Sequence, residues 1–257
     1  TAAIADSASV TAAGAVTLSA NDTATMTAEV DSLSLAAGLV GVAVGLSSSD
    51  NTVSDQVSAF IDSSSVTASD GDISVTAVSD LEVNSTTSVS ALSASIGLAG
   101  AGAESHVNLN GTTEAYVNSA ALTATGHDVT VAANSTSNAN SLTQGSSAGL
   151  GSVAVMLSDV SIGGATRAYA GGATTVSVNG LDIGATDSST ATPTTTVFSV
   201  GAVTGAGAHR DDVGRRAARD AGDGGAGHTG GGQGEVPGLH PGDRLIEGNG
   251  EIHAGRI

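Results

Sequence analysis

The stretch AFIDSSSVTASDGDISV, residues Ala59–Val75, recurs along this chain and decides the fold that we expect. It joins an aromatic and aliphatic start, a small polar turn, Val-Thr-Ala, a Gly-Asp turn and a strand that alternates apolar and polar residues. The copies are AIADSASVTAAGAVTL at Ala3–Leu18, AYVNSAALTATGHDVTV at Ala115–Val131 and, more loosely, AYAGGATTVSVNGLDI at Ala168–Ile183. A recurrence at a fixed period of about 55 residues indicates a repeat architecture.

A second element, rich in Gly and Ala, lies between these copies. It reads AAGLVGVAVGL at Ala36–Leu46, ASIGLAGAGAE at Ala94–Glu104, SAGLGSVAVML at Ser147–Leu157 and VGAVTGAGA at Val200–Ala208. We interpret these segments as strands whose inner face is nearly bare, at a narrow part of the fold.

The composition favours a stack of repeats over a round globule. Hydrophobic residues make up 40% of the 257 residues, but aromatic residues only 2%, so any core is thin. A quasi-linear array tolerates this, because each repeat buries itself against its neighbours. We therefore expect an all-β protein, a β-solenoid (parallel β-helix) built from repeats of about 55 residues. Short strands with turns every 8 to 12 residues would give two or three coils per repeat. A β-sandwich array is the competing architecture.

Charge limits the partners that we expect. The net charge is −18 at pH 7, Lys is absent, and Arg167 is the one Arg before residue 209. We expect no nucleic-acid binding, because that binding depends on basic side chains that neutralise phosphates. The most apolar run, Leu35–Leu46, is too short to span a bilayer, so we expect no membrane insertion by this segment.

The composition changes abruptly near His209. Residues 1–208 form the expected repeat array, and residues 209–257 form an expected low-order, irregular Gly/Arg-rich tail. The tail holds six of the seven Arg residues and has no Ser. We interpret it either as an out-of-frame continuation of the array or as a fragment of another domain. Its segment Leu239–Gly250 resembles a short PDZ or Hint-domain segment, but the PDZ carboxylate-binding loop and a Hint nucleophile are absent.

Some polar motifs have both a structural and a functional interpretation. Asp70-Gly71-Asp72 could bind calcium, but the other copies carry one acid there, which favours a β-turn. Gly97–Gly102 superficially suggests a nucleotide loop, but without a βαβ context we interpret it as close strand packing. His106 and His127 are isolated in the sequence, and we expect surface or turn positions for both.

The aromatic residues Phe60, Tyr116 and Tyr169 occupy one recurring position. We expect them to form a stacked ladder, with glycan stacking as the functional alternative. We predict no catalytic, cofactor-binding or metal-binding residues, and no cofactor.

The repeats resemble those of very large bacterial surface exoproteins, the filamentous-haemagglutinin-like and leukotoxin-like adhesins. The matching residues are Ala115–Asn118 with Leu122–Val131, and Ala59–Asp62 with Val66–Val75, and the resemblance covers roughly residues 1–208. It implies an extended, exported stalk at the bacterial cell surface without catalytic residues. The full-length protein would contact host-surface or matrix receptors or glycans.

We therefore expect a structural and adhesive module of a secreted or surface-displayed exoprotein, not an enzyme. A calcium-binding repeat segment of a secreted protein and a polysaccharide-active β-helix enzyme are the alternatives.

Overall fold

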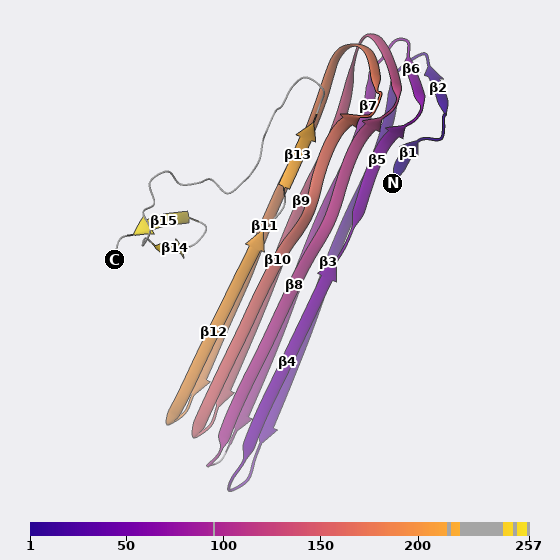
Figure 1. The fold of residues 1–257 in the computed structure, drawn as a ribbon. Helices are drawn as coiled ribbons and strands as arrows, with labels where there is room; N and C mark the ends of the chain where they lie inside the picture. The colour runs from indigo at the N-terminus through magenta and orange to yellow at the C-terminus, as the bar shows by residue number, and fades with distance from the viewer. Residues whose placement is uncertain (95, 215–216, 222–243, 249–250, 256–257) are drawn as a thin grey trace.

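The structure, a computed structural model, describes residues 1–94, 96–214, 217–221, 244–248 and 251–255. The described residues form strands and the turns between them, and none lies in a helix. The long strands lie side by side in two layers (Figure 1). The fold is therefore all-β, as the sequence predicts. Among these residues, no helix could cross a membrane.

The first sheet runs in the order β1-β5-β8-β10-β12, with β4 also paired to β8 and β13 to β10. Its pairings are all parallel. Its strands are β1 (Ala2–Ile4), β4 (Val42–Val53), β5 (Gln56–Asp62), β8 (Leu98–Asn118), β10 (Gly151–Gly171), β12 (Val203–Gly214) and β13 (Ala217–Ala221).

The second sheet is also parallel and runs in the order β2-β6-β9-β7-β3, with β11 paired to β9. Its strands are β2 (Ser9–Ala12), β3 (Val16–Ala36), β6 (Ser65–Ala68), β7 (Ile73–Ser93), β9 (Ala121–Ala148) and β11 (Thr175–Val200). The competing β-sandwich array is an antiparallel architecture, so these parallel sheets do not fit it.

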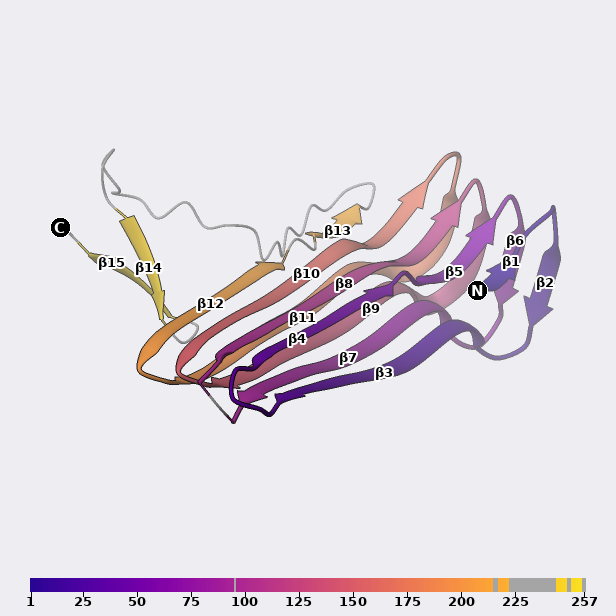
Figure 2. The same cartoon turned by 90° about the horizontal axis from the view of Figure 1, so that it is seen from below.

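The register of the first sheet follows the sequence repeat. Ala3 pairs with Phe60, Phe60 with Tyr116 and Tyr116 with Tyr169, which are steps of 57, 56 and 53 residues. The chain alternates between the two sheets, so each repeat contributes one passage to each of them (Figure 2). The expectation of two or three coils per repeat is therefore wrong.

The strands are much longer than the expected short ones. β7, β8 and β10 each contain 21 residues and β9 contains 28. Polar residues such as Asn84 lie inside these long strands, where side chains alternate between the core and the outer face. On the outer face Asn140 donates a hydrogen bond to Asn84 at 2.9 Å, so these polar groups extend the ladder and do not interrupt it.

Among the described residues, the core consists of three apolar clusters between the sheets. The largest surrounds the recurring stretch and includes Ile61, Ile73 and Val131. A middle cluster contains Leu109 and Ile162. The third, at the opposite end of the strands, is narrow and mostly alanine, with Ala43, Ala91, Ala99, Ala101, Ala103 and Ala154 packed around Val89 and Met156.

This narrow end agrees with the small inner face that the Gly-Ala segments predict. Gly145 faces the core there, and a Cβ atom on it would overlap the side chain of Met156. A Cβ on Gly45 would lie 2.8 Å from Cγ2 of Val89. Both glycines therefore lie where the two sheets approach each other closely.

One corner of each repeat uses a left-handed backbone position. Ser7, Ser63, Ser119 and Gly172 have φ values of 62°, 48°, 49° and 64°. The N–H of Ser63 donates to the carbonyl of Asn118 at 2.9 Å, and that of Ser119 donates to the carbonyl of Gly171 at 3.1 Å. Bonds to the next repeat therefore hold the corner in this conformation.

Strand β12 continues across the predicted boundary at residue 209. It pairs with β10 from Gly151↔Val203 to Ile162↔Gly214, and β13 then pairs with β10 further along. Strands β14 (Arg244–Gly248) and β15 (Glu251–Gly255) form an antiparallel pair. Much of the predicted tail, including Gly222–Gly232 and the first part of Leu239–Gly250, lies outside the described residues.

Candidate functional site

The recurring aromatic side chains form a stack across three neighbouring strands. Phe60 on β5, Tyr116 on β8 and Tyr169 on β10 are register partners. Ring centroids are 4.8 Å and 4.9 Å apart, and the ring planes differ by 1° and 3°. These spacings match the distance of about 4.8 Å between hydrogen-bonded strands, so the sheet itself sets the stacking distance. The predicted ladder of stacked rings is confirmed.

The stack presents ring edges more than ring faces. Phe60 covers one face of Tyr116 and Tyr169 covers the other. Sugar rings bind to aromatic residues through the open face, which Tyr116 does not offer. The three half-buried rings therefore join three consecutive repeats through their stacked faces.

The environment of the stack keeps its phenols neutral. Burial raises the pKa of Tyr116 above its usual value of 10.0, and the carboxylates of Asp62 and Glu114 raise it further. Burial also raises the pKa of Tyr169, with Glu114 the next largest cause, although Arg167 partly opposes the shift.

Polar pairs border the stack along the same strands. The guanidinium of Arg167 donates to Glu114 at 2.6 Å, and the two residues are register partners on β10 and β8. The amide of Asn118 donates to the Asp62 carboxylate at 2.7 Å. Each pair joins consecutive repeats, so these charges are arranged in ladders and do not converge on one point.

The candidate calcium turn, Asp70–Asp72, lies within the second sheet, between β6 and β7, which both pair with β9. Nε2 of His127 lies 3.4 Å from Oδ1 of Asp70, and Nδ1 lies 3.6 Å from Oδ1 of Asp72. The backbone N–H of Asp128 donates to Asp72 at 3.0 Å. Within the part of the chain that the structure describes, no three His, Cys, Asp or Glu side chains are grouped closely enough to hold a metal ion.

The other histidine also lies beside an acid. Nδ1 of His106 on β8 is 2.6 Å from Oδ2 of Asp159, its register partner on β10. Both imidazoles are partly exposed, as predicted, but neither is isolated. The sequence does not place them beside acids, because their partners come from neighbouring repeats.

The Gly97–Gly102 segment lies at the start of β8. A Cβ on Gly97 would overlap the carbonyl of Gly41, so this glycine permits close packing as predicted. Gly100 and Gly102 differ from Gly97 in their position. The buried residues of this segment are Ala99, Ala101 and Ala103, and these two glycines alternate with them on the outer face.

Sequence reasoning missed a chain of buried hydroxyl groups that connects the two sheets. Ser49 contacts Ser85 at 2.8 Å, Ser85 contacts Ser105 at 2.9 Å, and Ser141 donates to Ser105 at 2.9 Å. Ser158 then donates to Ser141 at 2.7 Å. The available signal was the recurrence of Ser at the repeat offset, since Ser49, Ser105 and Ser158 are register partners.

Comparison with known proteins gives no match: no protein-family model, curated protein or solved structure matches this chain. The assignment of a function therefore depends on the arrangement of the residues.

Proposed function

We propose that this chain is a structural, non-enzymatic segment of a secreted or surface-displayed bacterial exoprotein. Its repeats of about 55 residues form the flattened coils of a β-solenoid, and the coils together make a shaft that supports the adhesive parts of the full-length protein. Contacts with host-surface or matrix receptors or glycans belong to that full-length protein.

The observation that carries this proposal is the repeat-by-repeat register. Equivalent positions pair with one another in both sheets, as in Phe60↔Tyr116 and Ile73↔Val129. A repeat that pairs and packs with its neighbours can be added many times without changing the core, which suits an extended shaft.

The side-chain ladders give further support. The ring stack, the Asp62–Asn118 pair and the Asn84–Asn140 pair each join equivalent positions of consecutive repeats. Such ladders stabilise the addition of further repeats along one direction. They do not assemble the convergent acid and base groups that a hydrolytic site requires.

Surface labelling tests the location that we propose. Antibodies raised against the purified chain should label intact cells of the producing bacterium, and brief protease treatment of those cells should remove the label. A cytoplasmic enzyme should stay unlabelled until lysis and serves as the control. Labelling of the chain only after lysis would contradict the proposal.

Adhesion is tested separately with beads coated with the chain. Beads that carry the folded chain should bind host cells no better than beads that carry the urea-unfolded chain if this segment is only a shaft. Binding that needs the folded chain and is lost with Tyr116→Ala would assign the adhesive role to this segment.

A further inference from the structure

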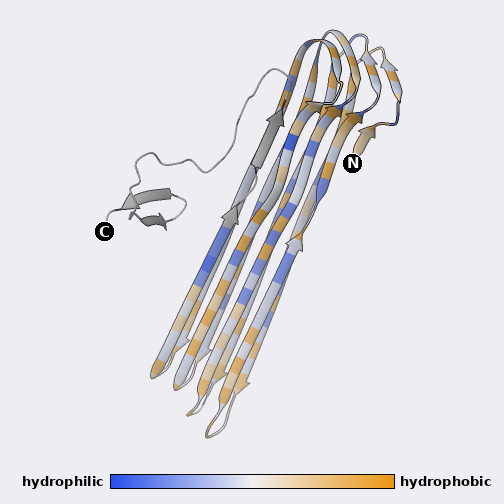
Figure 3. Ribbon diagram, in the orientation of Figure 1, coloured by the Kyte–Doolittle hydropathy of each residue, from blue (hydrophilic) through white to orange (hydrophobic). Residues whose placement is uncertain are grey.

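The first sheet carries an exposed apolar area at the end where β4, β8, β10 and β12 begin. Hydrophobic bands gather toward this end of the strands (Figure 3). On β4, Val44 and Leu46 are 59% and 74% exposed, and on β10 Val153 and Val155 are 55% and 46% exposed. These side chains point away from the core, because their neighbours Ala43 and Ala154 are the buried residues.

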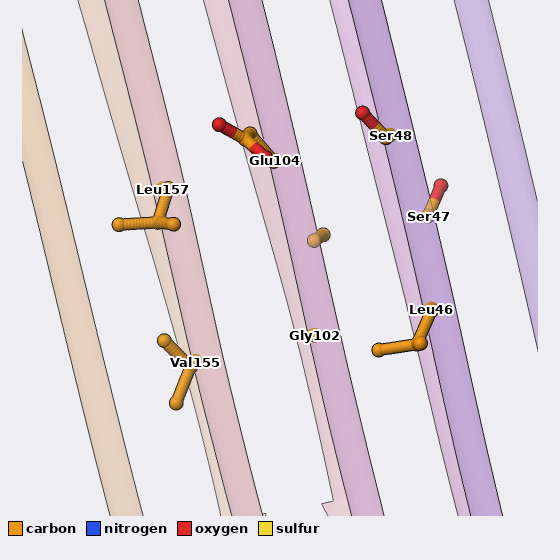
Figure 4. Close-up of a pocket in the computed structure, with 8 residues that line it drawn as sticks. Leu46, Ser47, Ser48, Gly102, Glu104, Val155 and Leu157 are labelled. Atoms are coloured by element: carbon orange, nitrogen blue, oxygen red, sulfur yellow. The ribbon is translucent and has the colours of Figure 1, made fainter.

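Glycines occupy the equivalent positions on β8, which lies between β4 and β10, and on β12, which lies on the far side of β10. Gly100 pairs with Val44 and Val153, and Gly102 pairs with Leu46 and Val155. Figure 4 shows Gly102 between Leu46 on one side and Val155 on the other. On β12, Gly205 and Gly207 pair with Val153 and Val155. At these two levels the outer surface therefore alternates ridge, groove, ridge and groove across β4, β8, β10 and β12. We call it the ridge-and-groove face.

The fold itself does not require three of these glycines. None of the four has a positive φ. A Cβ on Gly100 would lie 4.0 Å from the nearest atom of Val44, and Cβ atoms on Gly205 and Gly207 would lie 3.8 Å and 3.9 Å from Val153 and Val155. These are ordinary van der Waals distances, whereas glycine inside a strand weakens it. The grooves are thus open and cost stability within a single chain.

We propose that the ridge-and-groove face binds a second copy of this chain. A two-fold axis parallel to the strands, between β8 and β10, places β4 of one copy over β12 of the other and β8 over β10. This rotation keeps each residue at its own level along the strand. Val44 then faces Gly205 of the second copy, and Gly100 faces Val153 of the second copy. At the next level, Leu46 faces Gly207 and Gly102 faces Val155.

Every ridge at these two levels therefore enters a groove. A closed two-fold interface must be complementary to itself, and this face meets that condition at these two levels. Two residues closer to the start of the strands, Leu98 faces Gly151 of the second copy, whereas Val42 faces Val203. The face spans four strands about 4.8 Å apart and seven residues of about 3.3 Å, or about 440 Å² per copy. Two such faces bury less than the roughly 1,600 Å² of a standard interface, so we expect a reversible dimer.

Sedimentation equilibrium of the full chain tests the pairing, in salt sufficient to screen the net charge of −18. The wild-type chain should show a concentration-dependent monomer–dimer equilibrium. Gly100→Val should weaken the dimer at least about tenfold, because two valines then meet at one level. It should leave the thermal stability of the dilute monomer unchanged or raised. The matched control is Gly184→Val on β11, where a Cβ would meet nothing within 4 Å, and this variant should dimerise like the wild type.

The exchanged variant Gly100→Val/Val153→Gly swaps a ridge with a groove in both copies, and it should recover dimerisation relative to Gly100→Val. A wild-type chain that stays monomeric at all concentrations would overturn the proposal. Equal weakening of the dimer by Gly100→Val and Gly184→Val would also overturn it. The same holds if the exchanged variant dimerises no better than Gly100→Val. A monomeric chain that co-sediments with phosphatidylcholine vesicles would assign the face to lipid and overturn it as well.

Discussion

At the residue scale, the ionisation of the two tyrosines of the stack is coupled to folding. Both phenols have a pKa raised above 10.0, mainly by burial. The neutral form is therefore favoured in the folded chain. The stability that this provides is complete below pH 10 and is lost as the pH rises through the higher pKa of the folded state.

We predict that the wild-type chain loses stability above pH 10 and that Tyr116→Phe/Tyr169→Phe loses less. The chain contains two tyrosines, so tyrosinate absorbance reports these residues alone. Its titration midpoint should lie above 10.0 in the folded chain and return toward 10.0 in urea. At neutral pH the double variant should match the wild type within about 0.5 kcal/mol, because the rings still stack. A midpoint at or below 10.0 in the folded chain would contradict this assignment.

At the element scale, the hydroxyl chain connects strands of both sheets within an otherwise apolar interior. Ser105 on β8 is fully buried and contacts Ser85 on β7 and Ser141 on β9. Its hydroxyl therefore links the sheets between the alanine-rich cluster and the middle cluster of the core. Removal of this hydroxyl leaves two buried groups with one partner fewer each.

We predict that Ser105→Ala lowers the free energy of unfolding by about 1–3 kcal/mol, because two buried hydrogen bonds of about 0.5–1.5 kcal/mol each are lost. Urea unfolding followed by circular dichroism measures this. The matched control is Ser90→Ala, which removes a 3.0 Å hydroxyl contact with Ser146 on the partly exposed outer face. That change should cost less than about 0.5 kcal/mol. Equal losses of unfolding free energy in the two variants would show that the buried hydroxyl contacts stabilise the fold no more than the partly exposed one.

At the scale of the whole molecule, the strands differ in how many neighbours they have. β9 pairs with β6 and β7 on one side and with β11 on the other, whereas β3 pairs with β7 alone. Amides on the open side of β3 have no sheet partner among the described residues. In an array of this kind, stability decreases from the centre toward the edges.

We predict that peptides from β9 exchange their amide hydrogens at least about tenfold more slowly than peptides from β3. Hydrogen exchange followed by mass spectrometry on the isolated chain measures this difference. Peptides from β11 should resemble those from β3, since β11 pairs with β9 alone in its sheet. Uniform exchange across β3, β9 and β11 would indicate that the chain opens as one cooperative unit.

The sequence by itself determined the strand class, the repeat of about 55 residues and the alignment of Phe60, Tyr116 and Tyr169. These features follow from local alternation and from translation by one repeat, and both can be read along a single chain. The register in both sheets confirms that alignment.

The tertiary structure alone decided how each repeat is divided between the sheets. Polar residues such as Asn84 have hydrogen-bond partners one repeat away, so the strands continue through them. Partners from other repeats cannot be identified along a single chain. The contact of His106 with Asp159, the hydroxyl chain through Ser105 and the outward position of Gly100 were missed for this reason. Each depends on which residue lies across a sheet or between sheets, and that is fixed only when the two sheets are packed.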